Sequence, residues 1–143
     1  MKQLNTIPAE VAALIPKVQL KITKSNLHEY ADCIERLAIA LKKCPAIRDT
    51  DGLKEHPAIF HYFYGSTDIY ICEYNHDDYM FGYAILGGDL PNSEWGYFHL
   101  SELTSNLYYN IDYHFREQSI EAALHLAYPK YFKIPQSLAE KTV

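Results

Sequence analysis

The sequence lacks the short motifs from which many enzyme active sites can be assigned. It contains no HExxH, no paired CxxC, no H-x-H and no G-x-S-x-G, so it shows neither a motif-type metal site nor a serine nucleophile elbow. The pair Gly87-Gly88 lacks the Lys and the following helix that a phosphate cradle needs. An enzyme would have to assemble its site from side chains that are distant in the sequence.

Cysteine is scarce and long apolar runs are missing. Cys33, Cys44 and Cys72 are an odd number without metal-type spacing. Cys33 and Cys72 fall within apolar patterns, so we predict small core residues rather than nucleophiles. No signal-peptide pattern and no apolar run of membrane-spanning length occurs, so we expect a reduced, cytoplasmic protein without membrane contact.

Basic residues are almost missing from the second half of the chain. Between Glu55 and Pro129, one basic residue, Arg116, stands against eleven acidic residues, whereas the first 54 residues carry nine basic and six acidic residues. An acidic field repels phosphate backbones and attracts basic protein surfaces, so we expect a basic protein partner and no direct nucleic-acid binding. The alternative is that these carboxylates only solvate the surface.

What the chain has instead is aromatic residues: 13 Tyr, 6 Phe and one Trp. Four runs dense in aromatic and β-branched residues have the composition of strands. These runs are residues 58–64, 68–74, 79–86 and 95–100. The clusters Gly65-Ser66-Thr67 and Asn75-His76-Asp77-Asp78 between them favour tight reversals, so we predict an antiparallel meander.

Neither face of these strands is clearly polar. Strict alternation places Ile71 and Glu73 on one face, and Cys72 and Tyr74 on the other. We therefore expect helices to cover one face, while Tyr and His line the other. On that second face the tyrosines either cap a small core with their hydroxyls in water or form a surface for a partner.

Helical patterns flank the meander. Residues 27–43 carry apolar side chains at helical spacing, with Asn26 and Glu29 as a capping-box-like start, and Ser119 caps a helix that runs to residue 128. The weaker elements are a short helix at 7–15, a brief strand or extended linker at 18–22, and a strand at 108–116. The predicted fold is α+β: one domain, residues 1–143, in which an antiparallel meander of about four or five short strands packs against an N-terminal helix (27–43) and a C-terminal helix (119–128).

Three function classes are compatible with these features. The first is a non-enzymatic, acidic, tyrosine-rich module that binds a basic protein, without a cofactor. Its expected binding residues are Glu73, Asp77, Asp78, Asp89, Glu94, Trp95 and Tyr97. The second is a small metal-assisted hydrolase that uses His61, His99 and His114 with nearby carboxylates. The third is self-association through the aromatic face, with a homodimer as its simplest product.

Three blocks also carry a family resemblance: D-I-Y-I-C-E-Y-N-H-D-D-Y-M-F-G-Y-A-I-L-G-G at 68–88, E-W-G-Y-F-H-L-S-E-L at 94–103 and I-D-Y-H-F at 111–115. In order and spacing they resemble a small bacterial family catalogued as domain of unknown function 2958, over roughly residues 60–115. His99 stands where that family tends to have Ser. The resemblance implies a mobile genetic element and an accessory or host-defence-countering role, in which an acidic protein occupies the nucleic-acid-binding site of a basic partner. It transfers no catalytic residue.

Within the second block, Gly96 has a physical interpretation of its own. A glycine inside a strand lets a bulge or a close backbone approach form, so we predict one of these at Gly96.

Overall fold

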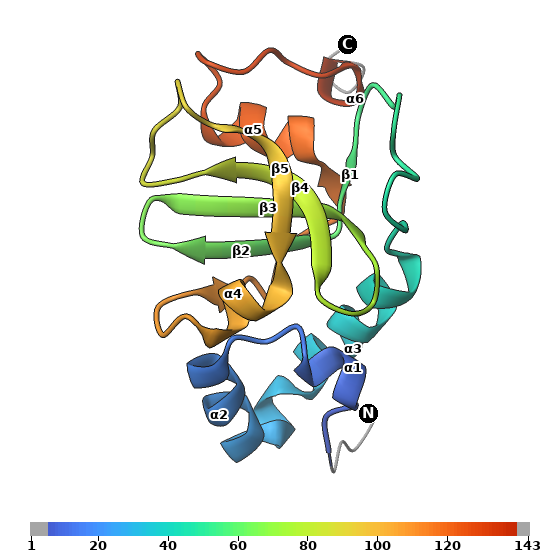
Figure 1. The fold of residues 1–143 in the computed structure, drawn as a ribbon, viewed down its shortest axis with the longest axis vertical. Helices are drawn as coiled ribbons and strands as arrows, with labels where there is room; N and C mark the ends of the chain where they lie inside the picture. The colour runs from blue at the N-terminus through green and yellow to red at the C-terminus, as the bar shows by residue number, and fades with distance from the viewer. Residues whose placement is uncertain (1–5, 140–143) are drawn as a thin grey trace.

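The computed structural model describes residues 6–139 and has an α+β fold (Figure 1). Its main sheet is antiparallel, with five strands in the order β5-β4-β3-β2-β6. These strands are β2 (Phe60–Tyr64), β3 (Thr67–Tyr74), β4 (Tyr79–Ile85), β5 (Glu94–His99) and β6 (Asn110–Ile111). A second, two-stranded sheet pairs β1 (Pro57–Ala58) with β7 (Gln118–Ser119). The predicted meander and fold class are confirmed.

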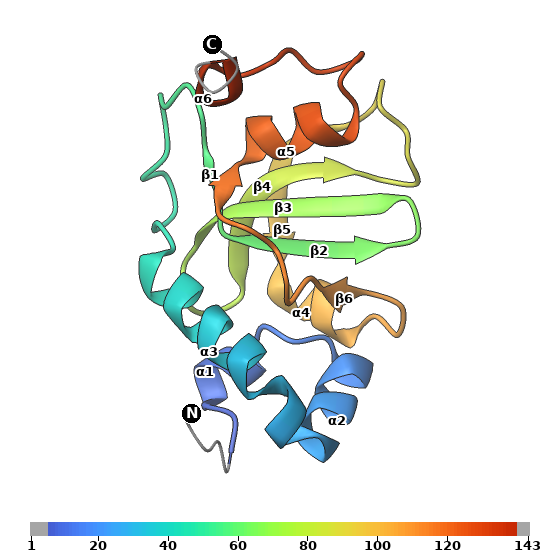
Figure 2. The same cartoon turned by 180° about the vertical axis from the view of Figure 1, so that it is seen from behind.

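Helices lie at both ends of the molecule (Figures 1 and 2). The helices are α1 (Ala9–Ala12), α2 (Lys17–Ser25), α3 (Leu27–Lys43), α4 (Leu100–Ser105), α5 (Ile120–Ala127) and α6 (Gln136–Ala139). Helices α1 to α3 gather at one end of the sheet, and α5 lies across its other end (Figure 2). None of the helices in this described range is long and apolar enough to cross a bilayer.

Helices α3 and α5 begin and end close to where the sequence predicts them. Helix α3 buries a stripe made of Cys33, Ile34, Leu37 and Leu41. Its expected cap is wrong, because Asn26 makes no side-chain cap bond and its amide donates to the Ile22 carbonyl instead (2.9 Å). Helix α5 has the predicted cap, since the Ser119 hydroxyl accepts a hydrogen bond from the Ala122 backbone N–H (3.0 Å).

Two weaker predictions are wrong. The segment 18–22 is helical, as part of α2, and the strand predicted at 108–116 shrinks to the two residues of β6. The Gln19 side chain joins the two elements, because its amide accepts from the Ile111 N–H (2.8 Å) and donates to the Ile111 carbonyl (2.9 Å). One glutamine thus occupies the outer edge of β6, a tertiary contact that no local pattern reveals.

Both faces of the sheet bury apolar side chains. One face packs on α1, α3 and α4, with Phe60, Tyr62 and Ile71 at its centre. The other face packs Tyr70 and Cys72 against α5. The expectation of an open second face lined by Tyr and His therefore fails over β3, where α5 covers it, and holds only toward β5.

A β-bulge changes the alternation in β3. The pairing with β4 shifts between Ile71 and Glu73, so that Gly82 faces Ile71 while Phe81 faces Glu73. Cys72 is the extra residue. The bulge puts Glu73 and Tyr74 on the faces opposite to those that strict alternation gives.

The close backbone approach occurs at Gly82 and not at Gly96. A Cβ atom on Gly82 would lie 1.8 Å from the Tyr70 carbonyl oxygen, whereas a Cβ on Gly96 would meet nothing within 4 Å. The prediction at Gly96 is therefore wrong. The strand that needs a glycine is β4, next to the bulge.

Candidate functional site

An aromatic ladder covers one face of the β4–β5 hairpin. Register places three pairs directly across the two strands: Tyr79 and His99, Phe81 and Tyr97, and Tyr83 and Trp95. The rings are in contact, with Tyr79 and Tyr97 stacked at 4.8 Å between centroids and Phe81 and Trp95 stacked at 5.7 Å. We call these six residues the aromatic ladder. Its order follows from alternation, which sends every second side chain of each strand to the same face.

The ladder is graded from a covered end to an open end. At the covered end, the His56 ring lies 4.4 Å from Trp95, and Phe132 of the C-terminal tail contacts Tyr83 edge-on at 5.9 Å. The Tyr83 hydroxyl is also hydrogen bonded to the Ser93 hydroxyl (2.8 Å). Toward the open end, Tyr97 of the middle pair is 50% exposed, and the side chain of His99 in the last pair is 56% exposed. Rings fixed in this way offer contact area without a large loss of side-chain entropy on binding.

The hairpin also forms one edge of the main sheet. β5 is the outermost strand of the sheet, and within residues 6–139 no strand pairs with its outer side. An unpaired edge presents free N–H and C=O groups to which an extended segment can add.

Acidic residues lie at both ends of the hairpin. Asp77 and Asp78 form the turn before β4, and Asp89 lies in the loop between β4 and β5. Asp77, Asp89 and Glu94 are exposed. Glu94 pairs with Ala84, so its side chain points away from the ladder face. No Lys or Arg occurs from residue 55 to 115, so no cation of the hairpin itself neutralises these groups.

Asp78 joins the turn before β4 to His99 and Ser101 at the open end of the ladder. Its carboxylate accepts hydrogen bonds from the Ser101 N–H (2.7 Å), the Ser101 hydroxyl (3.1 Å) and the His99 ring (3.2 Å). These bonds, the backbone N–H of Ser101 first, lower the pKa of Asp78. The carboxylate therefore stays charged, and it fixes His99 beside Tyr79.

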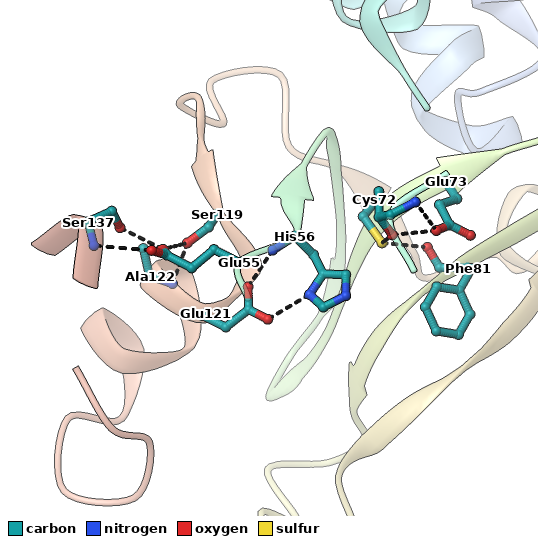
Figure 3. A network of polar contacts seen from close by, with 10 residues as sticks. Glu55, His56, Cys72, Glu73, Phe81, Ser119, Glu121, Ala122 and Ser137 are labelled. Atoms are coloured by element: carbon teal, nitrogen blue, oxygen red, sulfur yellow. Dashed lines mark hydrogen bonds and ion pairs between the residues drawn. The ribbon is translucent and has the colours of Figure 1, made fainter. Parts of the chain in front are cut away.

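Glu73 does not belong to this surface. It is 1% exposed, and its carboxylate accepts from the Arg48 N–H (2.7 Å), the Thr50 N–H (3.0 Å) and the Thr50 hydroxyl. Figure 3 shows Glu73 beside Cys72. The side chain holds a loop whose Arg48 adopts φ 77°. Of the predicted binding residues, the structure therefore gathers Asp77, Asp78, Asp89, Glu94, Trp95 and Tyr97 on one hairpin, and it buries Glu73 elsewhere.

The three histidines of the hydrolase hypothesis do not converge. The His61 ring lies between Asp68 (2.7 Å) and Asp112 (3.2 Å) and stacks on Tyr70, whereas His99 is at the far edge of the sheet. His114 is exposed, and only its backbone N–H is bonded to Asp112. Among residues 6–139, no group of three His, Cys, Asp or Glu side chains is placed to hold a metal ion.

Cys33 and Cys72 are core residues, as predicted, and Cys44 is buried as well. All three are buried and free. Burial raises the pKa of Cys44 and of Cys72 to about 12, so both remain thiols at neutral pH. The Cys72 sulfur lies near the Thr50 hydroxyl (3.8 Å) and the Phe81 carbonyl (3.5 Å), and no His, Lys or carboxylate among residues 6–139 is hydrogen bonded to it.

Two parts of the hairpin environment were not predicted from the sequence. Tyr79, Phe81 and Tyr83 belong to the ladder through the β4–β5 register, although the alternation of Y-M-F-G-Y and W-G-Y-F-H is the signal that could have identified them. The other part is a polar network next to Trp95. His56 is bonded to Glu121 there (2.8 Å) by a contact between residues 65 positions apart (Figure 3).

Comparisons with known proteins give no relative. No family model, no curated protein and no solved structure matches the chain. The resemblance to domain of unknown function 2958 is therefore neither supported nor contradicted, and it stays a prediction.

Proposed function

We propose that the protein is a binding module whose β4–β5 hairpin docks a basic, extended segment of a partner protein. The observation that carries this proposal is the aromatic ladder, which is open at Tyr97 and lies on an edge strand between acidic turns. Aromatic residues are enriched at the energetic centres of protein interfaces. An extended segment would pair with β5 and lay alternate side chains over the rings.

Charge selects the partner's chemistry. Lys and Arg side chains of a bound segment would meet Tyr faces, which attract cations, and the carboxylates of Asp77 and Asp89 at the two ends. Each exposed charge pair contributes little, so the carboxylates mainly orient the partner and speed its association. A phosphate backbone would be repelled by the same groups.

In the cell, we propose, such docking would serve to counter a host defence protein. A basic, nucleic-acid-binding protein would offer the required surface, and the hairpin would block it by presenting carboxylates where phosphates bind. The support for this part is the family resemblance and the charge layout. Self-association is a second use of the same edge, and a mass measurement separates a homodimer from a complex with a partner.

The test uses defined peptides and the single tryptophan of the chain. A synthetic peptide of roughly eight residues that alternates Lys with Thr would match the length of the edge strand. We expect its binding to change Trp95 fluorescence at low salt and to weaken at high salt, because exposed charge pairs are screened. The same peptide with Gln in place of Lys should bind at least about tenfold more weakly.

Charge variants locate the site. A variant with Asp77→Asn, Asp89→Asn and Glu94→Gln should bind the Lys peptide about three- to tenfold more weakly. The matched control removes three exposed carboxylates from the N-terminal helices: Glu10→Gln, Glu29→Gln and Asp32→Asn. Equal weakening by both variants would show a general charge effect and contradict docking at the hairpin.

A further inference from the structure

A cleft bordered by basic residues lies away from the acidic hairpin. It has a volume of about 340 Å³ and lies between α3 and the segment that leads from β6 to β7. Figure 2 shows this segment running down across the sheet on the side where α3 is seen. Ligand pockets for small molecules begin at about this size.

The floor of the cleft is apolar. Ile39 and Ala40 of α3 line it, together with Pro57 and Ala58 of β1, Ile59 and Phe115. Ile39 is 47% exposed, although it is a large aliphatic side chain on a helix whose other face supplies the core. An exposed apolar floor of this kind is available for an apolar ligand body.

Three cations border this floor. Arg36 and Lys43 stand on α3 at positions that flank Ile39 and Ala40, and Arg116 stands on the segment across the cleft. All three are exposed, and within residues 6–139 no carboxylate lies at ion-pair distance from any of them. Glu117 is the one acidic residue that lines the cleft. Arg116 is also the one basic residue between positions 55 and 129. The single cation of this acidic part of the chain therefore lines the cleft.

A neighbouring hollow has a different lining. It shares Pro57 and residues 116–118 with the cleft and is larger, about 580 Å³, but two carboxylates, Glu55 and Glu117, line it together with one cation, Arg116. Of these two hollows, the cleft beside α3 is the one that combines an apolar lining with an excess of positive charge.

We propose that the cleft between α3 and residues 115–118 binds a small anionic amphiphile, a carboxylate or phosphate group on an apolar body. The head group would lie among Arg36, Lys43 and Arg116, whose guanidinium and ammonium groups donate to anionic oxygens. The apolar body would cover Ile39, Ile59 and Phe115 and bury them from water. This site is separate from the aromatic ladder, so it does not depend on the docking proposal.

The first experiment measures binding by calorimetry with three probes that share one tail: decanoate, decyl phosphate and decanol, each below its micelle concentration. We expect one or both anions to bind at one site per chain, and decanol to bind at least about tenfold more weakly. Methyl signals of Ile39 and Ile59 in NMR spectra should shift on binding. Equal binding of decanol, or no binding of either anion, would overturn the proposal.

Variants then separate the site from net charge. Arg36→Met, Lys43→Met and Arg116→Met together should weaken anion binding by about tenfold while they keep the side-chain bulk. The control is Lys17→Met, Lys21→Met and Lys24→Met, which removes three exposed cations from α2 and should leave binding unchanged. Ile39→Asp should abolish binding, and because Ile39 is half exposed, the variant is expected to fold as judged by circular dichroism. Equal loss in the control variant, binding retained by Ile39→Asp, or equally tight binding of a short poly-Glu peptide would contradict the proposal.

Discussion

At the scale of single residues, Glu73 shows how a carboxylate in an acidic segment can be structural. Sequence alone groups it with the acidic surface of the meander, but the bulge at Cys72 turns it toward the loop at residues 48–50. There it accepts two backbone N–H groups and one hydroxyl. A buried carboxylate with this many donors fixes the loop and leaves no oxygen for a partner.

Glu73→Gln should lower the free energy of unfolding by about 2 kcal/mol, because the amide puts an N–H₂ donor against groups that donate. Urea denaturation measures the change. The matched control is Glu102→Gln, which removes an exposed carboxylate and should change stability by no more than about 0.5 kcal/mol. Identical midpoints for Glu73→Gln and the wild type would contradict the structural role.

The two strand glycines give a second comparison at this scale. Gly82→Ala should destabilise the protein by about 3 kcal/mol, because the new methyl group would overlap the Tyr70 carbonyl oxygen. Gly96→Ala should be neutral or stabilise by up to about 1 kcal/mol, since its Cβ meets open space and Ala loses less backbone entropy. Thermal unfolding of both variants checks the pair. Equal effects would mean that the close approach is not at Gly82.

At the scale of elements, one carboxylate ties α6 of the C-terminal tail to β1 and the start of α5. Glu55 precedes β1 and accepts from the Ser119 hydroxyl (2.6 Å), and also from the N–H (3.1 Å) and hydroxyl (2.6 Å) of Ser137 in α6 (Figure 3). These bonds, that of Ser119 first, lower the pKa of Glu55 below its ordinary value of 4.5. A lowered pKa means that the folded state favours the charged form.

The stability contribution of Glu55 is therefore present above pH 4.5 and is lost as the pH falls below that value through the folded-state pKa. Glu55→Gln should cost about 1 kcal/mol at neutral pH, at the low end for charged hydrogen bonds because the group is partly exposed. The difference in unfolding free energy between Glu55→Gln and the wild type should become smaller at acid pH. Urea denaturation across this range is the measurement, with Glu117→Gln as the control. A constant difference at all pH values would contradict this linkage.

Elements also differ in how far they can be read from the sequence. α3 and α5 follow from a long apolar stripe and from the Ser119 cap, both of which are local. α2 and β6 do not, because the bonds of Gln19 to Ile111 join positions 92 residues apart. The bulge at Cys72 is likewise invisible in the alternation of T-D-I-Y-I-C-E-Y, and it alone decides where Glu73 points.

At the scale of the whole molecule, the sequence predicts the region of the candidate site but not all of the residues that form it. Composition and charge select the hairpin region, and they identify Trp95 and Tyr97. The rest of the ladder depends on strand register, and the covered end depends on His56 and Phe132, which reach Trp95 and Tyr83 through the packing of the chain. The acidic, aromatic hairpin and the cationic cleft offer surfaces of opposite chemistry on one small protein.

The central claim, that the aromatic ladder is a docking surface, is tested most directly by two matched tyrosines. Tyr97 and Tyr108 are both exposed, at 50% and 61%, and each stacks on another tyrosine, but only Tyr97 belongs to the ladder. The measurement is calorimetric titration of the alternating Lys-Thr peptide into the wild type, Tyr97→Ala and Tyr108→Ala at low salt. We expect Tyr97→Ala to weaken binding by about tenfold, the scale of an aromatic interface residue, and Tyr108→Ala to bind like the wild type. Unchanged binding by Tyr97→Ala, or an equal loss in Tyr108→Ala, would contradict the account.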